Sequence, residues 1–239
     1  MEDLVLLLAA PFVGSLLGVL IRRLPAGGPV GFARSRCTGC HVALSAAEMV
    51  PLLSYAALGG LCRRCGSAIG RFHPLVELAG LALAALAVAV DPGRALVACA
   101  LGWPLLALAW IDIETMTLPD ALTLPLIVGG IAQAAWLAPQ MLGDRALGAT
   151  FGWGVLTLIG QCYRRLRGVD GLGGGDARLL AAGGAWLGWQ ALPDVVLLAS
   201  LVAILVALAL RLRAHARLPF GPFLAASIWL LFLMRPPGA

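Results

Sequence analysis

Eight runs of mainly apolar residues, each 16 to 18 residues long, constrain the fold of this chain more than any other feature. The runs cover residues 4–21, 74–90, 95–111, 121–138, 146–162, 177–192, 194–210 and 219–234. The hydrocarbon layer of a membrane is about 30 Å thick and a helix rises about 1.5 Å per residue, so one crossing needs about 20 apolar residues. All eight runs are somewhat shorter than this, and several are short enough to predict a thin or tightly packed bundle.

The composition supports a membrane protein, because 61% of the residues are hydrophobic and only 12% are charged. The apolar residues are mainly Ala and Leu, which favours helices, and the alternating strands of a membrane barrel are missing. These figures argue against disorder, a secreted disulfide scaffold and nucleic-acid binding. We therefore predict an all-α fold, a polytopic bundle of about eight transmembrane helices in the lipid bilayer. Glycines within the runs predict close helix contacts, notably Gly14, Gly18, Gly183, Gly184 and Gly188.

Arginine supplies all 17 basic residues and predicts the orientation of the spans. With eight spans, one side receives Arg22, Arg23, Arg34, Arg36, Arg63, Arg64, Arg71, Arg164, Arg165, Arg167, Arg178, Arg211, Arg213 and Arg217. The other side receives only Arg94, Arg145 and Arg235. Because positive charge is enriched on the cytosolic side, we expect an external N-terminus and a cytosolic 23–73 loop. Glu2 and Asp3 replace the basic start of a signal peptide, so the first run is predicted to be retained.

Four cysteines in that loop form two CxxC pairs, Cys37 with Cys40 and Cys62 with Cys65, separated by 21 residues. This pairing is typical of a zinc site in which two short turns present four thiolates to one tetrahedral ion. Four protein ligands leave no open position, which predicts a structural Zn²⁺. Two disulfides or a redox pair are the alternatives, although a reducing compartment disfavours structural disulfides.

Two aspartates stand out near the predicted cytosolic side of the membrane. Asp112 ends the third run, where a carboxylate can mark a function or simply reach water. Asp176 follows Gly173-Gly174-Gly175 and precedes the sixth run, where it can equally be an ordinary helix cap. The predicted topology places both on the same side, so packing of the two helices can bring them together. Two carboxylates that share a site hold one proton between them and can act as acid and base.

Taken in order, these residues resemble the type IV prepilin peptidases, which are membrane aspartyl proteases of the GxGD class. The resemblance rests on several motifs across most of the chain: Arg23-Leu24-Pro25, the paired CxxC loop around Pro51-Leu52-Leu53-Ser54-Tyr55, Pro74-Leu75-Val76-Glu77-Leu78, Ile111-Asp112, Leu118-Pro119-Asp120, Gly173-Gly174-Gly175-Asp176 and Phe220-Gly221-Pro222-Phe223.

The resemblance implies a bacterial inner-membrane aspartic endopeptidase that removes, after Gly, the leader of type IV prepilins and type II secretion pseudopilins. Asp112 and Asp176 occupy the positions of the catalytic pair, and Gly173, Gly175, Glu114, Asp120 and Arg178 are expected to support the substrate or the structure. Many members also methylate the new N-terminus with S-adenosylmethionine. The implied organisation is a first transmembrane helix (1–22), a cytosolic zinc domain (23–73) and a membrane-embedded peptidase domain (74–239).

Two alternatives from other functional classes remain open at the level of sequence. The same carboxylates could serve an ion or proton-coupled transporter, which would leave the four-cysteine loop without a role. A noncatalytic zinc-bearing assembly factor would not need either aspartate.

Overall fold

The computed structural model describes residues 1–28, 35–168, 173–212 and 218–235. Each of the eight predicted runs forms a helix, and within these described ranges there is no β-strand, which confirms the all-α fold. The eight helices are α1 (Glu2–Arg23), α3 (Phe72–Val90), α4 (Ala95–Thr115), α5 (Asp120–Leu137), α6 (Leu142–Arg167), α7 (Gly174–Leu187), α8 (Leu192–Ala209) and α9 (Gly221–Met234). A short helix, α2 (Leu53–Ala57), lies in the cysteine loop. Arg34, Arg213 and Arg217, named above, fall outside the described residues.

Five of the described helices are long and apolar enough to cross a membrane: α1, α3, α4, α5 and α8. The helix α9 is apolar but shorter. Tight 3-10 turns join consecutive helices at Pro92–Arg94, Pro139–Met141 and Trp189–Ala191. Two of these turns begin with proline, whose fixed φ and missing N–H suit the first position of a helical turn.

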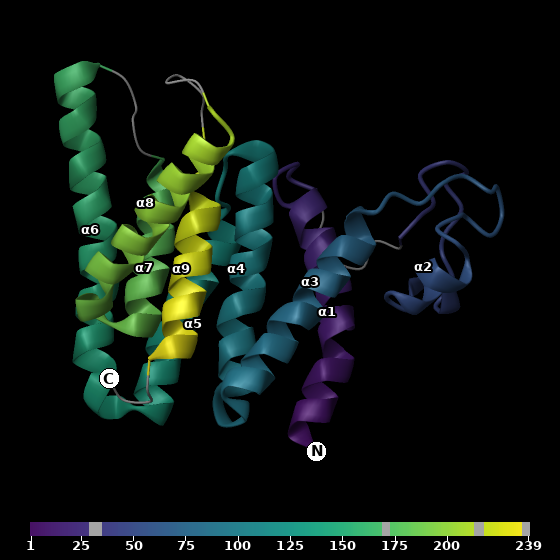
Figure 1. The fold of residues 1–239 in the computed structure, drawn as a ribbon, viewed down its shortest axis with the longest axis horizontal. Helices are drawn as coiled ribbons and strands as arrows, with labels where there is room; N and C mark the ends of the chain where they lie inside the picture. Colours follow the sequence, from purple (N-terminus) through teal and green to yellow (C-terminus); the bar gives the residue numbers. More distant parts are fainter. Residues whose placement is uncertain (29–34, 169–172, 213–217, 236–239) are drawn as a thin grey trace. The chain divides into compact units, whose positions relative to one another are not determined.

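The chain divides into two compact units, Met1–Trp103 and Pro104–Ala239. In the first unit, α1 packs along α3 (Figure 1). Gly14 allows this approach, because a Cβ atom there would lie 2.6 Å from the Cα of Glu77. On the facing helix, a Cβ at Gly80 would lie 3.3 Å from the Cα of Gly14. The predicted contact at Gly14 is therefore confirmed, and it follows from the small-residue packing typical of membrane helices.

The second unit is built around α7, which contacts α5, α6, α8 and α9 (Figure 1). All residues of α7 from Leu179 to Leu187 are buried. Its closest neighbour is α6, where a Cβ at Gly148 or Gly184 would collide with the carbonyl oxygen of the other residue. The indole N–H of Trp186 also donates to the carbonyl oxygen of Leu126 on α5, at 2.8 Å. The C-terminal half of α7 is thus held by neighbours on several sides.

The helices α6 and α7 differ most from their predicted bounds. The sixth run was expected to continue to residue 192, but α7 ends at Leu187 because Gly188 adopts a φ of 85° that a continuing helix cannot use. The helix α6 extends beyond the predicted 146–162 at both ends, reaching Leu142 and Arg167. Hydrophobicity alone missed these extensions, because the added turns carry polar residues such as Asp144 and Arg164.

Candidate active site and metal centre

Asp112 lies three residues before the end of α4 and is only 5% exposed. One carboxylate oxygen, Oδ2, accepts a hydrogen bond of 2.9 Å from the backbone N–H of Gly221, the first residue of α9. A Cβ at Gly221 would stand 2.7 Å from that same oxygen, so only glycine permits the approach. A buried carboxylate needs such a donor, because an unpaired one is costly away from water. The start of α9 therefore fixes the position of Asp112.

Asp176 lies in the first turn of α7, where its backbone N–H donates to the carbonyl oxygen of Gly173 at 3.1 Å. Its side chain is half-buried. The two carboxyl groups lie close enough for the charge on Asp112 to act on Asp176. The fold thus brings together two acidic groups that are 176 − 112 = 64 residues apart in the chain.

The glycines before Asp176 differ in what surrounds them. A Cβ at Gly175 would lie 2.8 Å from the Cβ of Leu118, so this glycine lets α7 begin directly against the segment that follows α4. A Cβ at Gly173 would lie 3.4 Å from Oδ2 of Asp176, at the edge of ordinary contact. The backbone is therefore less crowded at Gly173 than at Gly175.

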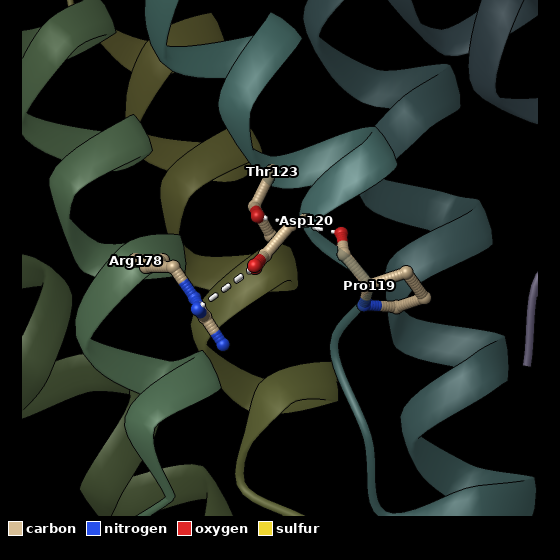
Figure 2. Close-up of polar contacts among 4 residues, drawn as sticks. All are labelled: Pro119, Asp120, Thr123 and Arg178. Carbon is tan, nitrogen blue, oxygen red and sulfur yellow. Dashed lines mark hydrogen bonds and ion pairs between the residues drawn. The ribbon is translucent and has the colours of Figure 1, made fainter.

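Asp120 and Arg178 form an ion pair between the first turn of α5 and the first turns of α7 (Figure 2). Nη1 of Arg178 lies 2.9 Å from Oδ1 and 3.1 Å from Oδ2 of Asp120. The Nε of Arg178 is buried and finds no hydrogen-bond acceptor among the described residues. Nearby, the hydroxyl of Thr123 donates to the carbonyl oxygen of Pro119 at 3.3 Å (Figure 2). The Asp120–Arg178 ion pair thus joins the start of α5 to the first turns of α7, which carry Asp176.

Glu114 is placed differently from the other predicted supporting residues. Its side chain is exposed, and Oε1 accepts a hydrogen bond of 3.1 Å from the indole N–H of Trp110 one turn earlier on α4. That contact is local to one helix. The structure thus gathers Asp112, Asp176, Gly175, Asp120 and Arg178, and gives Glu114 a partner on its own helix.

The four cysteines of the loop come together in the first unit. Their sulfur atoms all lie within 4.8 Å of one another, so Cys37, Cys40, Cys62 and Cys65 can hold one metal ion. The sulfurs of Cys37 and Cys65 are 3.8 Å apart. A tetrahedral ion with Zn–S bonds of about 2.3 Å separates its sulfur ligands by about 3.8 Å, whereas a disulfide bond is about 2.05 Å long. All four thiols are free, and the geometry fits a metal better than a disulfide.

Hydrogen-bond donors around the sulfurs of Cys37 and Cys65 favour the thiolate form that a metal requires, whereas burial and the neighbouring thiols raise the pKa of the Cys40 thiol to about 11. The backbone N–H of Cys40 contributes most to lowering the pKa of the Cys37 thiol to about 5, followed by the hydroxyl of Ser67. The Ser67 hydroxyl, 3.0 Å from Sγ of Cys65, also lowers the pKa of that thiol. A lowered pKa raises the thiolate fraction at neutral pH, which suits metal binding.

Sequence reasoning gave no role to two residues that the structure makes prominent. Gly221 appeared only within a motif, and its bond to Asp112 spans 109 residues, so no local pattern could reveal it. Glu77 also appeared only within a motif, but it is 6% exposed and accepts a hydrogen bond of 2.8 Å from the backbone N–H of Leu52. The available signal was an acidic residue within an otherwise apolar run, which commonly marks function in membrane helices.

Comparison with known proteins places the chain among membrane peptidases. Residues 99–208 match the model of the type IV leader peptidase family, and residues 8–90 match that of the bacterial peptidase A24 N-terminal domain. A prepilin leader peptidase/N-methyltransferase of Burkholderia pseudomallei is 43% identical, over 90% of this chain and 79% of the relative. A protein of the same name from Aeromonas salmonicida is 45% identical, over 84% of this chain and 71% of the relative. Another, from Dickeya chrysanthemi, is 39% identical, over 94% of this chain and 89% of the relative. No solved structure matches the chain.

The chain belongs to the type IV leader peptidase family, as its motifs indicated. Its two units correspond broadly to the two matched models, with the cysteine loop in the N-terminal one and both aspartates in the other. The names of the relatives give no support to a transporter.

Proposed function

We propose that this protein is a prepilin peptidase, which removes the leader of type IV prepilins and type II secretion pseudopilins at the cytosolic face of the bacterial inner membrane. The observation that carries the proposal is the pairing of buried Asp112 with Asp176 across 64 residues of chain, within a family of leader peptidases. The match to relatives named prepilin leader peptidase/N-methyltransferase supports the substrate class.

In the proposed mechanism the aspartates act as one acid–base couple. Two adjacent carboxyl groups cannot both ionise cheaply, so one retains a proton while the other stays charged. The charged group accepts a proton from a water molecule as the water attacks the carbonyl carbon of Gly, and the protonated group donates to the carbonyl oxygen, which gives a gem-diol. The group that took the proton then donates it to the amide nitrogen, and the C–N bond breaks to release the new N-terminus and a Gly carboxyl group. The Gly221 N–H holds Asp112 in place during the reaction. The Asp120–Arg178 ion pair restrains the first turns of α7, which carry Asp176, against the start of α5.

The cysteine loop has a structural part in this proposal. A Zn²⁺ ion held by Cys37, Cys40, Cys62 and Cys65 stabilises a loop that buries few apolar side chains of its own. The arginine distribution supports a cytosolic loop and an external N-terminus. The relatives' second activity extends the proposal to N-methylation of the new N-terminal residue, with S-adenosylmethionine as methyl donor.

Mass spectrometry of a co-expressed prepilin tests both activities in one measurement. The wild-type protein should yield a pilin that has lost its leader and gained one methyl group. Asp112→Asn and Asp176→Asn should each leave the leader attached, at protein levels equal to wild type. Normal processing by both single variants in purified membranes would refute the aspartyl mechanism, and an intact leader with wild-type protein would refute the peptidase itself.

A further inference from the structure

The connection between α4 and α5, residues 116–119, begins four positions after Asp112 and is not helical. Met116 has a φ of 53°, a left-handed conformation that stops a helix. Leu118 precedes Pro119, and the residue before a proline is biased towards an extended backbone. Pro119 itself is extended, with a φ of −65° and a ψ of 134°. The chain therefore leaves α4 as a short extended segment.

The backbone of this segment carries hydrogen-bonding groups that the protein does not use. Among the residues that the structure describes, the backbone N–H and C=O groups of Thr117 and Leu118 have no hydrogen-bond partner. Most backbone groups of folded proteins are paired, and non-helical backbone at membrane depth is tolerated only inside protein or beside a water-filled cavity. Leu118 is buried, but Thr117 is exposed. Thr117 can therefore offer one donor and one acceptor to a second chain.

The segment is fixed beside both aspartates. At its start, the N–H of Met116 donates to the carbonyl oxygen of Asp112 at 2.9 Å. Further along, Leu118 is 7% exposed, and a Cβ at Gly175 would lie 2.8 Å from the Cβ of Leu118. The segment thus lies against the first turn of α7, next to Asp176. A peptide that pairs with this segment is therefore brought to the two carboxyl groups.

Peptide cleavage requires a substrate in the form that such a segment can bind. Within a helix, each carbonyl oxygen accepts a hydrogen bond from the N–H four residues further on, so a helical peptide bond must unwind before water can attack it. The unwound peptide has free N–H and C=O groups, which are costly to leave unpaired near a membrane. An extended protein segment with free backbone groups can pair with them, as in the addition of a strand to the edge of a sheet.

We propose that the 116–119 segment binds the substrate beside the scissile bond as an extended chain, through the backbone N–H and C=O groups of Thr117. The inference rests on the proposed function, because it assigns a binding site to the same substrate. Neighbouring residues of an extended chain point their backbone groups to opposite edges, so Thr117 and Leu118 cannot both face the peptide. Buried Leu118 anchors the segment in the protein, and exposed Thr117 faces the peptide.

A matched pair of variants tests the N–H of Thr117 alone. Thr117→Ala keeps the backbone amide, and its ester counterpart carries lactic acid at the same position, so the two proteins differ only where one N–H becomes an ester oxygen. Steady-state cleavage of a synthetic prepilin peptide gives KM and kcat for both. We expect the ester to raise KM about three- to tenfold, the worth of one backbone hydrogen bond, with kcat nearly unchanged. Equal KM values would overturn the proposal.

N-methylation of the peptide tests the same pairing with the wild-type protein, so it does not depend on any variant folding. One methyl group at a time is placed on the amides that flank the scissile bond. We expect KM to rise for one of these amides, and not for the amides on either side of it, because these point to the opposite edge. A KM that no single methyl group raises, or that all raise equally, would overturn the proposal.

Cleavage of the unmodified peptide by the wild-type protein separates the two proposals. If that peptide is cleaved and either test gives the contrary result, this inference alone is refuted. If the wild-type protein leaves the unmodified peptide intact, the peptidase is refuted and this inference with it.

Discussion

The cysteine loop and the helix bundle of the second unit bring distant residues together by different means. In the loop, two short turns repeat one geometry: Cys37 N–H bonds to Val42 O and Cys62 N–H to Ser67 O, at 3.0 and 2.8 Å. Few apolar side chains of the loop are buried. In the bundle, helices meet at glycines with their backbones in contact, and nearly all of α7 is buried. Order in the loop should therefore depend on a metal ion, and order in the bundle on close packing.

The largest expected effect is loss of the metal from the loop. Cys37→Ser combined with Cys62→Ser should abolish zinc binding, which in four-ligand structural sites is worth about 10 to 16 kcal/mol. Elemental analysis should fall from about one zinc per chain to none, as a single four-cysteine site requires. Limited proteolysis should then cut the loop while the second unit stays intact. The exposed Cys162→Ser is the control and should keep its zinc. A double variant that retains the metal would contradict the conclusion that these cysteines hold the zinc on which the loop depends.

The next largest effect should be a loss of stability when one methyl group is added between α6 and α7. Gly184→Ala places a Cβ against the carbonyl oxygen of Gly148, and we expect a loss of about 2 to 3 kcal/mol in unfolding free energy from overpacking. Gly154→Ala is the matched control, because it lies on α6 with no atom near its Cβ position. Thermal unfolding in detergent should separate the two variants, with zinc content unchanged in both. Equal stabilities would show that backbone contact does not hold the bundle together.

Disturbing the hydrogen bond between Gly221 and Asp112 should have a smaller effect, which is limited to the rate of leader cleavage. Gly221→Ala forces the start of α9 away from Asp112 Oδ2, and we expect leader cleavage to fall about tenfold, since small misplacements of catalytic groups are costly. Gly174→Ala makes the same change at the first residue of α7, where no atom lies within 4 Å, and should cleave nearly as wild type. Initial rates on a purified prepilin give the comparison, and similar rates for both variants would count against this role of Gly221.

The smallest effect should come from the ion pair in Figure 2. The Asp120 and Arg178 side chains are 53% and 35% exposed, so water screens their attraction. A double-mutant cycle with Asp120→Asn and Arg178→Gln should give a coupling of about 0.2 to 1 kcal/mol, as exposed pairs do. A coupling above this range would show that the pair behaves as a buried one.

The sequence was sufficient to predict the helices and the four-cysteine cluster, because apolar length and CxxC spacing are local signals. The catalytic role of the two aspartates stays a prediction. The end of α7 at Gly188 could not be predicted, because glycine is also common inside membrane helices. The Gly221–Asp112 bond and the Leu52–Glu77 bond join residues 109 and 25 positions apart. Such contacts depend on which helices pack together, and hydrophobicity indicates that a helix is buried without specifying its neighbour.

The most direct test of the carboxylate couple is a double-mutant cycle on the rate of leader cleavage. If Asp112 and Asp176 act as one acid–base unit, each single Asn variant should lose about 10²- to 10⁴-fold in rate, the range of general acid–base catalysis. The double variant should then be no slower than the worse single variant, because groups that act as a unit are not additive. Losses that multiply in the double variant, or a single variant that cleaves at the wild-type rate, would contradict the couple.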